Sequence, residues 1–380
     1  MYKGTIIYVG NFELPDKGAS ANRVVANGKI FTQLGYRVVF LGIRKDVLFD
    51  NICVTEFDAN MYEEAYPRNA YQWMKHMCSV KNIKMLAEQY DDTCMIILYN
   101  APFVLLQTAK RHFKKSKIKV VYDCTEWTTV TDGSIIKRFI KKIDERFVRQ
   151  KAGSVADGMI VISHMMEKAY SMNKPLILLP PLVDLNDEIW NQKRKKESSD
   201  FEFCFAGMLD GNKDSLDKIV EAFAELKHAN SILRIIGVSR EEFLAYYPDL
   251  EKVVNKAVGD ICFMGRLSHK ETIQYVQNCD CYIFVRPSDL RNNAGFPTKF
   301  AEAYSCGCPM IASNVSDIGE YFTSGADGIL LDCLTVCEIK QAMQTVMAND
   351  VDDMKCEKKR VFHYESYAER CEKWMEQLLD

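Results

Sequence analysis

The sequence lacks the features that mark membrane-spanning, repetitive and nucleic-acid-coating proteins. It has no apolar run long enough to span a bilayer and no signal-peptide core, so we expect a cytoplasmic protein, with contact at the inner face of the cell membrane left open. It has no short repeat or low-complexity tract, which excludes solenoids. A charge excess is also missing, because 49 Lys and Arg face 52 Asp and Glu, and we predict no nucleic-acid partner.

Metal-binding patterns are absent as well. The 14 cysteines form no CxxC pair, and most lie in apolar runs such as 203–205 and 261–263, which is typical of reduced, buried thiols. The sequence Asp350-Val351-Asp352 is the only Asp-x-Asp, and it lies in an acidic turn rather than after an apolar strand. We therefore expect neither a structural zinc nor a metal held by that motif.

What is present is the alternation of an α/β protein. The length of 380 residues predicts two domains. Short apolar runs alternate with segments of helical period, the pattern of parallel sheets with crossover helices. Strands are predicted in the first half at 5–10, 37–42, 95–99, 119–123, 158–163 and 176–179, and in the second half at 201–206, 232–237, 261–265, 282–285, 309–312 and 328–331. Two sets of six predict two similar, Rossmann-like, doubly wound parallel sheets.

A polar stretch separates the two sets. Residues 191–200 have no apolar period and are typical of a linker or exposed turn. We predict an N-terminal domain at 1–184, a linker at 185–200, a C-terminal domain at 201–363 and a last helix at 364–380. The pattern of that helix allows packing on either sheet.

The first loop lacks the common phosphate motifs. Neither GxGxxG nor GxxxxGK[ST] follows the first strand, which excludes a plain NAD dehydrogenase and a P-loop enzyme. Gly18 and Ser20 stand where a helix is predicted to begin. Backbone N–H groups there could hold an anion, and a simple N-cap by Ser20 is the alternative.

The most informative segment is 286–311. A strand ends at a polar turn, and a short helix is opened by Gly295, Phe296, Pro297 and Thr298. An open helix N-terminus can hold a diphosphate, Lys299 adds a cation, and Glu302 can accept hydrogen bonds from ribose hydroxyls. An ordinary crossover helix with a proline in its first turn is the alternative.

This segment resembles the donor site of retaining glycosyltransferase family 4, whose members have the GT-B fold of two Rossmann-like domains facing a cleft. The resemblance extends to Gly207 and Lys213, where the family has a glycine and a lysine that meets the donor phosphates, and to Gly265 and Arg266 in the loop at the nucleotide base. The N-terminal half fits more loosely, as expected of an acceptor domain. The resemblance implies transfer of a sugar with retention, without a metal or other cofactor.

Two departures from the family pattern matter. Ala294 stands where the family has its donor-sugar glutamate, and Met208 stands where an arginine usually follows the phosphate-strand glycine. Our hypothesis is that Arg286 or Lys299 supplies the missing positive charge.

The N-terminal half offers two candidate catalytic carboxylates. Family members often have a histidine near the donor sugar, and this chain has Asp123 and Glu126 at the end of a predicted strand. A carboxylate there could orient the acceptor hydroxyl or stabilise positive charge on the sugar ring. Capping of the following helix is the alternative.

A basic region lies between Lys110 and Lys151. Thirteen cations face five carboxylates there, and its second half interleaves apolar side chains with the cations. This pattern predicts an amphipathic helix that could lie on an anionic lipid surface, with a solvated face over a buried stripe as the alternative.

We therefore predict a metal-independent hexosyltransferase. The donor would be a UDP- or GDP-sugar. The acceptor would be a glycan or lipid-linked precursor, because the sequences of residues 295–300 and 11–17 are similar to those of bacterial capsular and exopolysaccharide enzymes. Two alternatives stay open: a nucleotide-sugar epimerase or hydrolase of the same fold, and a non-catalytic GT-B subunit.

Overall fold

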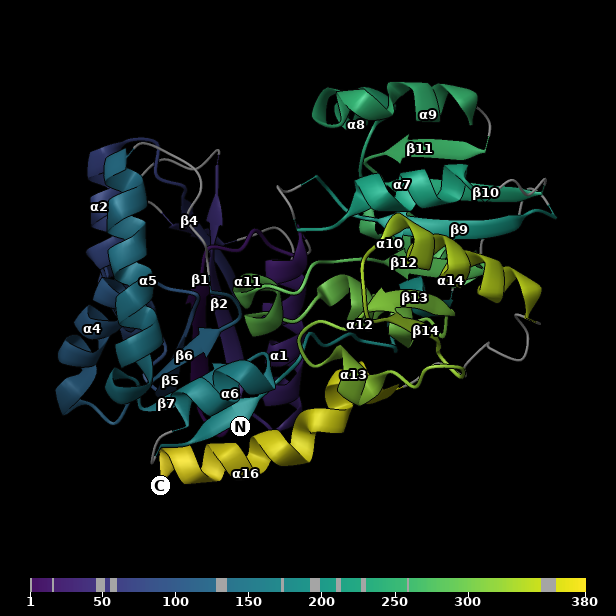
Figure 1. Cartoon of the computed structure of the whole chain (residues 1–380). Helices are drawn as coiled ribbons and strands as arrows, with labels where there is room; N and C mark the ends of the chain where they lie inside the picture. The colour runs from purple at the N-terminus through teal and green to yellow at the C-terminus, as the bar shows by residue number, and fades with distance from the viewer. Residues whose placement is uncertain are drawn as a thin grey trace. The chain divides into compact units, whose positions relative to one another are not determined.

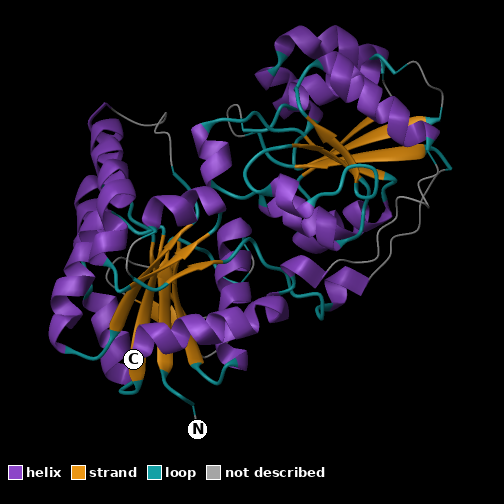
Figure 2. Ribbon diagram, turned by 60° about the horizontal axis from the view of Figure 1, so that its bottom comes forward, coloured by secondary structure: helices purple, strands orange, loops and turns teal. Residues whose placement is uncertain are grey.

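The computed structural model forms two compact units, each built on its own sheet (Figures 1 and 2). Unit 1 comprises Met1–Val183, Ala294–Phe296 and Tyr364–Asp380, and unit 2 comprises Asp184–Asn293 and Pro297–His363. The structure describes residues 2–15, 17–45, 52–54, 60–127, 135–171, 174–191, 199–209, 213–226, 230–257, 260–349 and 360–380. The Asp-x-Asp at 350–352 and residues 192–198 of the predicted linker lie outside these residues.

Unit 1 contains a sheet with the order β3-β4-β2-β1-β5-β6-β7-β8, in which β3 (Ile52–Val54) pairs antiparallel and the other strands are parallel. These are β1 (Thr5–Gly10), β2 (Arg37–Arg44), β4 (Met61–Ala65), β5 (Thr93–Tyr99), β6 (Lys119–Cys124), β7 (Gly158–Val161) and β8 (Leu176–Leu178). All six predicted strands are present. Strands β3 and β4 were not predicted, because β3 is short and β4 carries Glu63 and Glu64 in place of an apolar run.

Helices cover this sheet, and the chain's last helix is one of them (Figure 1). The helices are α1 (Ala19–Gln33), α2 (Ala70–Cys78), α3 (Lys81–Gln89), α4 (Phe103–His112), α5 (Ile135–Val155), α6 (His164–Tyr170) and α16 (Ala368–Leu379). Trp374 and Leu378 of α16 are buried in the core that contains Ile6, Phe31 and Ile97. The terminal helix therefore packs on the N-terminal sheet, against α1 and β8.

Unit 2 contains a six-stranded, all-parallel sheet with the order β11-β10-β9-β12-β13-β14. The strands are β9 (Phe201–Ala206), β10 (Ser231–Ile236), β11 (Ile261–Gly265), β12 (Cys281–Phe284), β13 (Met310–Ser313) and β14 (Gly328–Leu331). Each lies within one residue of its prediction. The core is formed by side chains such as Phe203, Ile219, Leu233, Ile283 and Ile339. The predicted architecture of two doubly wound parallel sheets is confirmed.

The helices of unit 2 cross over between these strands (Figure 2). They are α7 (Leu216–Ala224), α8 (Arg240–Tyr246), α9 (Glu251–Lys256), α10 (His269–Asn278), α11 (Leu290–Ala294, which ends in the stretch grouped with unit 1), α12 (Thr298–Ser305), α13 (Ile318–Tyr321) and α14 (Val336–Ala348). Within the part of the chain that the structure describes, no helix is both long and apolar enough to cross a bilayer.

The strand order determines where each unit can bind a ligand. In unit 1 the order reverses between β1 and β5, and in unit 2 between β9 and β12. Loops that follow two such strands leave in opposite directions, and open α/β sheets bind their ligands at the carboxyl ends of these strands. The residues after β9 and β12 are therefore the first place to look for the predicted donor site.

Candidate functional site

Two cations share one buried carboxylate at the β9–β12 switch point. Asp214 precedes α7, and its side chain is 5% exposed. Arg286, two residues after β12, donates to Asp214 Oδ1 from Nη2 at 2.7 Å and from Nε at 2.8 Å. Lys299, in the first turn of α12, donates from Nζ to Oδ2 at 2.6 Å. The two candidate cations of the sequence analysis are thus brought together, through a carboxylate that it had not singled out.

The cluster keeps a positive charge at neutral pH. Burial acts to raise the pKa of Asp214, but the ion pairs with Lys299 and Arg286 outweigh burial and hold that pKa below its ordinary value. Asp214 is therefore ionised, and the three groups together carry one net positive charge.

Glycines allow the loops around this cluster to approach closely. At Gly207, after β9, a Cβ would lie 2.2 Å from Lys299 Nζ and 2.9 Å from Cζ of Phe205. Lys299 Nζ lies 5.4 Å from the centre of the Phe205 ring. Gly237 has φ near +97°, and a Cβ there would lie 2.3 Å from the carbonyl oxygen of Gly207. The predicted glycine Gly207 and the predicted cation Lys299 are in direct contact.

Lys213 and Met208 lie on the same loop, which joins β9 to α7. Lys213 is half-buried and immediately precedes Asp214, so the predicted phosphate lysine lies one residue from the cation cluster. Met208 is 65% exposed. Met208, which stands where the resembling family has an arginine, therefore packs little against the protein interior.

The helix expected to open at Gly295 begins at Thr298. A further helix, α11, ends at Ala294, so Gly295, Phe296 and Pro297 form the connection to α12, in which Phe296 and Pro297 are buried. Pro297 is the N-cap of α12, with no capping side chain and no acidic residue in the first turn. The N–H groups of this first turn have no side-chain acceptor from the cap, as an anion-binding helix start requires.

Glu302 has a partner that the sequence analysis missed. Its Oε1 lies 3.0 Å from Nε2 of His269, at the start of α10, and both side chains are partly exposed. Gly265, with φ near +61°, ends β11 and is followed by the exposed Arg266. The predicted ribose carboxylate and base-loop residues thus lie in the same unit as the cation cluster. A histidine three residues after Arg266 was the available signal for the Glu302 partner.

Asp123 lies near the end of β6, but its side chain does not face a ligand site. It is fully buried in unit 1, where Arg23 Nη2 donates to its Oδ1 at 3.0 Å and the Tyr8 hydroxyl donates to its Oδ2. Arg23 also donates to the carbonyl of Leu179 at 2.9 Å. These bonds join α1, β1, β6 and the loop after β8, so Asp123 stabilises the unit and offers no oxygen to an acceptor. Of the two predicted carboxylates, Glu126 is the exposed one.

The start of α1 is open. Its N-cap is Gly18, with φ near +99°, and no side chain caps the helix, so the alternative N-cap by Ser20 is wrong. Apart from its two chain neighbours, none of the described residues has a heavy atom within 4 Å of where a Cβ of Gly18 would stand.

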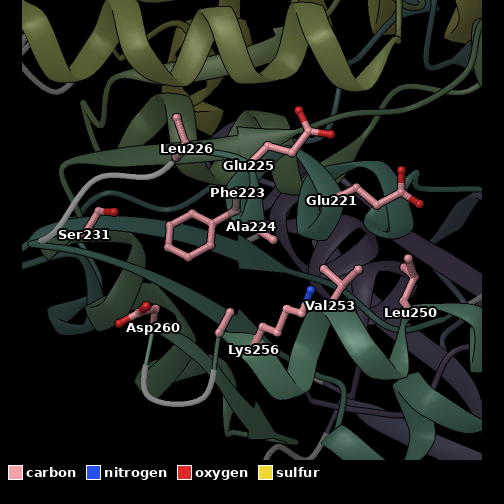
Figure 3. A pocket seen from close by; sticks show the side chains of 11 residues that line it. Glu221, Phe223, Ala224, Glu225, Leu226, Ser231, Leu250, Val253, Lys256 and Asp260 are labelled. Carbon is pink, nitrogen blue, oxygen red and sulfur yellow. The ribbon is translucent and has the colours of Figure 1, made fainter.

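The structure shows no group of three potential metal-ligating side chains among its described residues. A cavity of about 580 Å³ does lie in unit 2, between α7 and α9 (Figure 3). Its lining includes Ser231 at the start of β10 and Asp260 just before β11, at the amino ends of the strands. It therefore lies at the sheet edge opposite the Asp214 cluster, and we do not assign the donor to it.

The chain is similar to known proteins both over unit 2 and over its whole length. Residues 186–367, most of unit 2, match the family described as glycosyl transferases group 1. An uncharacterized glycosyltransferase of Methanocaldococcus jannaschii is 22% identical over 314 residues, 80% of this chain and 82% of the relative. Sucrose-phosphate synthase of Thermosynechococcus elongatus is similar with a TM-score of 0.72 and 17% identity over 99% of both chains. HepE of Anabaena, solved with UDP and glucose, gives a TM-score of 0.69 and 13% identity over 98% of this chain and 99% of that chain.

Proposed function

We propose that the protein transfers a hexose from a UDP- or GDP-sugar to a hydroxyl group, because residues 186–367 match the glycosyl transferases group 1 family and the chain has the GT-B fold. The acceptor we propose is a glycan or a lipid-linked precursor of a polysaccharide. UDP is the nucleotide in the HepE complex. Retention at the anomeric carbon follows the resemblance described above.

The observation that carries the proposal is the Asp214 cluster. A departing nucleoside diphosphate gains negative charge as its bond to the sugar breaks, and preorganised cations stabilise that charge. Arg286 and Lys299 are held in place before the donor arrives, because Asp214 binds both of them. Lys213 and the first turn of α12 add a further cation and backbone N–H groups. These groups support a transfer that needs no bound metal.

The other donor contacts follow from the same unit. We assign Glu302, which His269 orients, to the ribose hydroxyls, and the turn at Gly265 and Arg266 to the base. Within unit 1, the open start of α1 at Gly18 offers backbone N–H groups to an anion.

A thermal-shift screen against UDP-, GDP- and CMP-sugars tests the proposal. A ligand that binds only the folded protein stabilises it by about 2.7 kcal/mol at one hundred times its dissociation constant. We expect one nucleotide class to raise the melting temperature (Tm), and Lys299→Ala to weaken that rise. No response to any of the sugars would contradict donor binding.

A non-catalytic GT-B subunit is the second candidate. Ala294, in place of the donor-sugar glutamate, and the exposed Met208 favour it. Donor binding without turnover over a broad panel of acceptors would support this function. Equal release of sugar with and without acceptor would instead indicate a hydrolase, and conversion of the donor itself an epimerase.

We also propose that α5 contacts an anionic membrane surface. Five large apolar side chains of α5 are 41–83% exposed: Ile135, Phe139, Ile140, Ile143 and Phe147. Four of these follow one another at intervals of four residues and so share one side of the helix. Soluble proteins rarely expose such a stripe without a partner.

The charges around the stripe favour a lipid partner. Exposed cations accompany it along the helix, namely Arg138, Lys141, Lys142, Arg146 and Arg149. Each Lys or Arg near an anionic bilayer contributes about 1 kcal/mol, and each apolar side chain that enters the interface adds to this. Such a contact would keep the enzyme beside a lipid-linked acceptor.

Vesicle sedimentation tests the membrane contact. We expect binding to phosphatidylcholine vesicles that contain phosphatidylglycerol, and loss of binding in Phe139→Asp. Tyr246→Asp, at an exposed aromatic residue on α8, is the matched control that should still bind. Equal binding by both variants would contradict a role of α5.

A further inference from the structure

A second polar cluster lies in unit 1, on the helices and strands around the β1–β5 switch point. From it we infer that His76 of α2 binds the acceptor hydroxyl. This inference rests on the proposed function. Gly10 ends β1, Tyr99 ends β5, and Asn11 is the first loop residue after β1. Because the strand order reverses between β1 and β5, the carboxyl ends of these strands are where the sheet of unit 1 is expected to bind a ligand.

A carboxylate holds the His76 ring in place. Nδ1 of His76 lies 3.0 Å from Oε1 of Glu64 on β4, and the other oxygen of Glu64 accepts a hydrogen bond from Asn82 at 2.6 Å. The two side chains of the pair are 14% and 19% exposed. A carboxylate on one ring nitrogen fixes the orientation of the imidazole, and the other nitrogen can then face a ligand.

The second ring nitrogen faces the loop after β1. Nε2 of His76 lies 2.9 Å from Oδ1 of Asn11, which is an exposed side chain. A cavity of about 30 Å³ beside them is also lined by Gly10, Tyr99 and Pro102. This space holds about two water molecules. An acceptor hydroxyl that displaces the Asn11 side chain would occupy the same hydrogen-bonding position on Nε2.

Aromatic side chains beside the histidine indicate a sugar. The ring of Trp73 meets His76 edge to face at 6.1 Å between centroids, and Tyr66 meets Trp73 in the same manner at 5.4 Å. Aromatic rings next to a directed polar group provide an apolar surface and a hydrogen bond together, which matches the C–H and hydroxyl faces of a pyranose. These rings favour a sugar hydroxyl over a simple alcohol as the acceptor.

The experiment measures nucleotide release from the sugar donor that responds in the thermal-shift screen, without acceptor and with octyl β-glucoside. Water replaces the acceptor in the first case and the glucoside hydroxyl in the second. We expect His76→Ala to lower both rates by about ten- to a hundredfold, the range that loss of substrate positioning costs, with an unchanged Kd for the nucleotide. His76→Gln keeps a hydrogen-bonding group and should retain part of the rate.

Two controls separate positioning from folding. His112→Gln alters an exposed histidine in the last turn of α4 and should keep the wild-type rate. Glu64 acts through His76, so Glu64→Gln should retain more activity than Glu64→Ala. Equal rates for wild type and His76→Ala, or nucleotide binding with no release by the wild type, overturn the inference. Absence of nucleotide binding by the wild type overturns the proposed function instead.

Discussion

Asp214→Asn is the sharpest test of the cation cluster in unit 2. The substitution keeps the shape of the side chain and removes its charge, which leaves the buried Arg286 guanidinium and the Lys299 ammonium without a carboxylate. Removing one partner of a buried ion pair costs about 3–5 kcal/mol of unfolding free energy. For a unit of this size we expect Tm to fall by roughly 6–20 °C.

A bound nucleotide should reverse much of this loss. The diphosphate supplies negative charge where Asp214 has lost it, so saturating UDP, or whichever nucleotide responds, should raise the Tm of Asp214→Asn more than that of the wild type. Differential scanning fluorimetry over a nucleotide titration measures both shifts. Glu202→Gln is the matched control, because Glu202 forms a buried ion pair with Arg234 at 2.8 Å in the same unit.

The control residue lies at the start of β9, at the opposite edge of the sheet. We expect Glu202→Gln to lose comparable stability and to show the wild-type nucleotide shift. An Asp214→Asn protein with wild-type Tm, or with a nucleotide shift no larger than that of Glu202→Gln, would refute the reasoning.

The pH dependence of the same variant has a definite sign. The pKa of Asp214 is lowered in the folded protein, so its contribution is complete above the unfolded value of about 3.9 and disappears as pH falls through the folded value. The Tm difference between wild type and Asp214→Asn should therefore be constant near neutral pH and narrow below pH ~4. A difference that grows with acidification would contradict this assignment.

Three further predictions concern packing, stability and metal. Gly207→Ala should displace Lys299 and weaken nucleotide binding about tenfold, with a small loss of Tm. Gly237→Ala should lose more stability, because its Cβ would meet a backbone oxygen at a residue with positive φ. Calorimetry measures the loss of binding, and thermal melts measure the loss of stability. Asp123→Asn should cost about 3–5 kcal/mol in urea denaturation, because the buried Arg23 guanidinium loses its counter-charge, with nucleotide Kd unchanged. Dialysis against EDTA should leave the transfer rate unchanged.

The pattern of apolar residues along the sequence predicted most of the strands. Strands buried on both faces are apolar along their length, so the runs that became β1 and β9 could be recognised with their ends. The two strands at one edge of the unit 1 sheet were not recognised, because β4 is partly polar and its neighbour β3 is only three residues long. Glycine and proline at 295 and 297 marked the turn before α12, although the helix itself begins later.

The partners of the charged side chains could not be predicted in this way. Whether a carboxylate after a strand faces solvent or a buried guanidinium depends on residues far away in the chain. Asp123 meets Arg23 one hundred positions earlier, and Asp214 meets Arg286 seventy-two positions later. Glu64 and His76 likewise pair only because β4 and α2 lie together.

The sequence alone determined the α/β class and the two sheets, because apolar periodicity is a property of neighbouring residues. Tertiary structure alone decided which cations share Asp214, that Asp123 is a buried structural ion pair, and that α16 packs on the N-terminal sheet. Strand order brings distant residues together at one sheet edge, and no local pattern encodes that order.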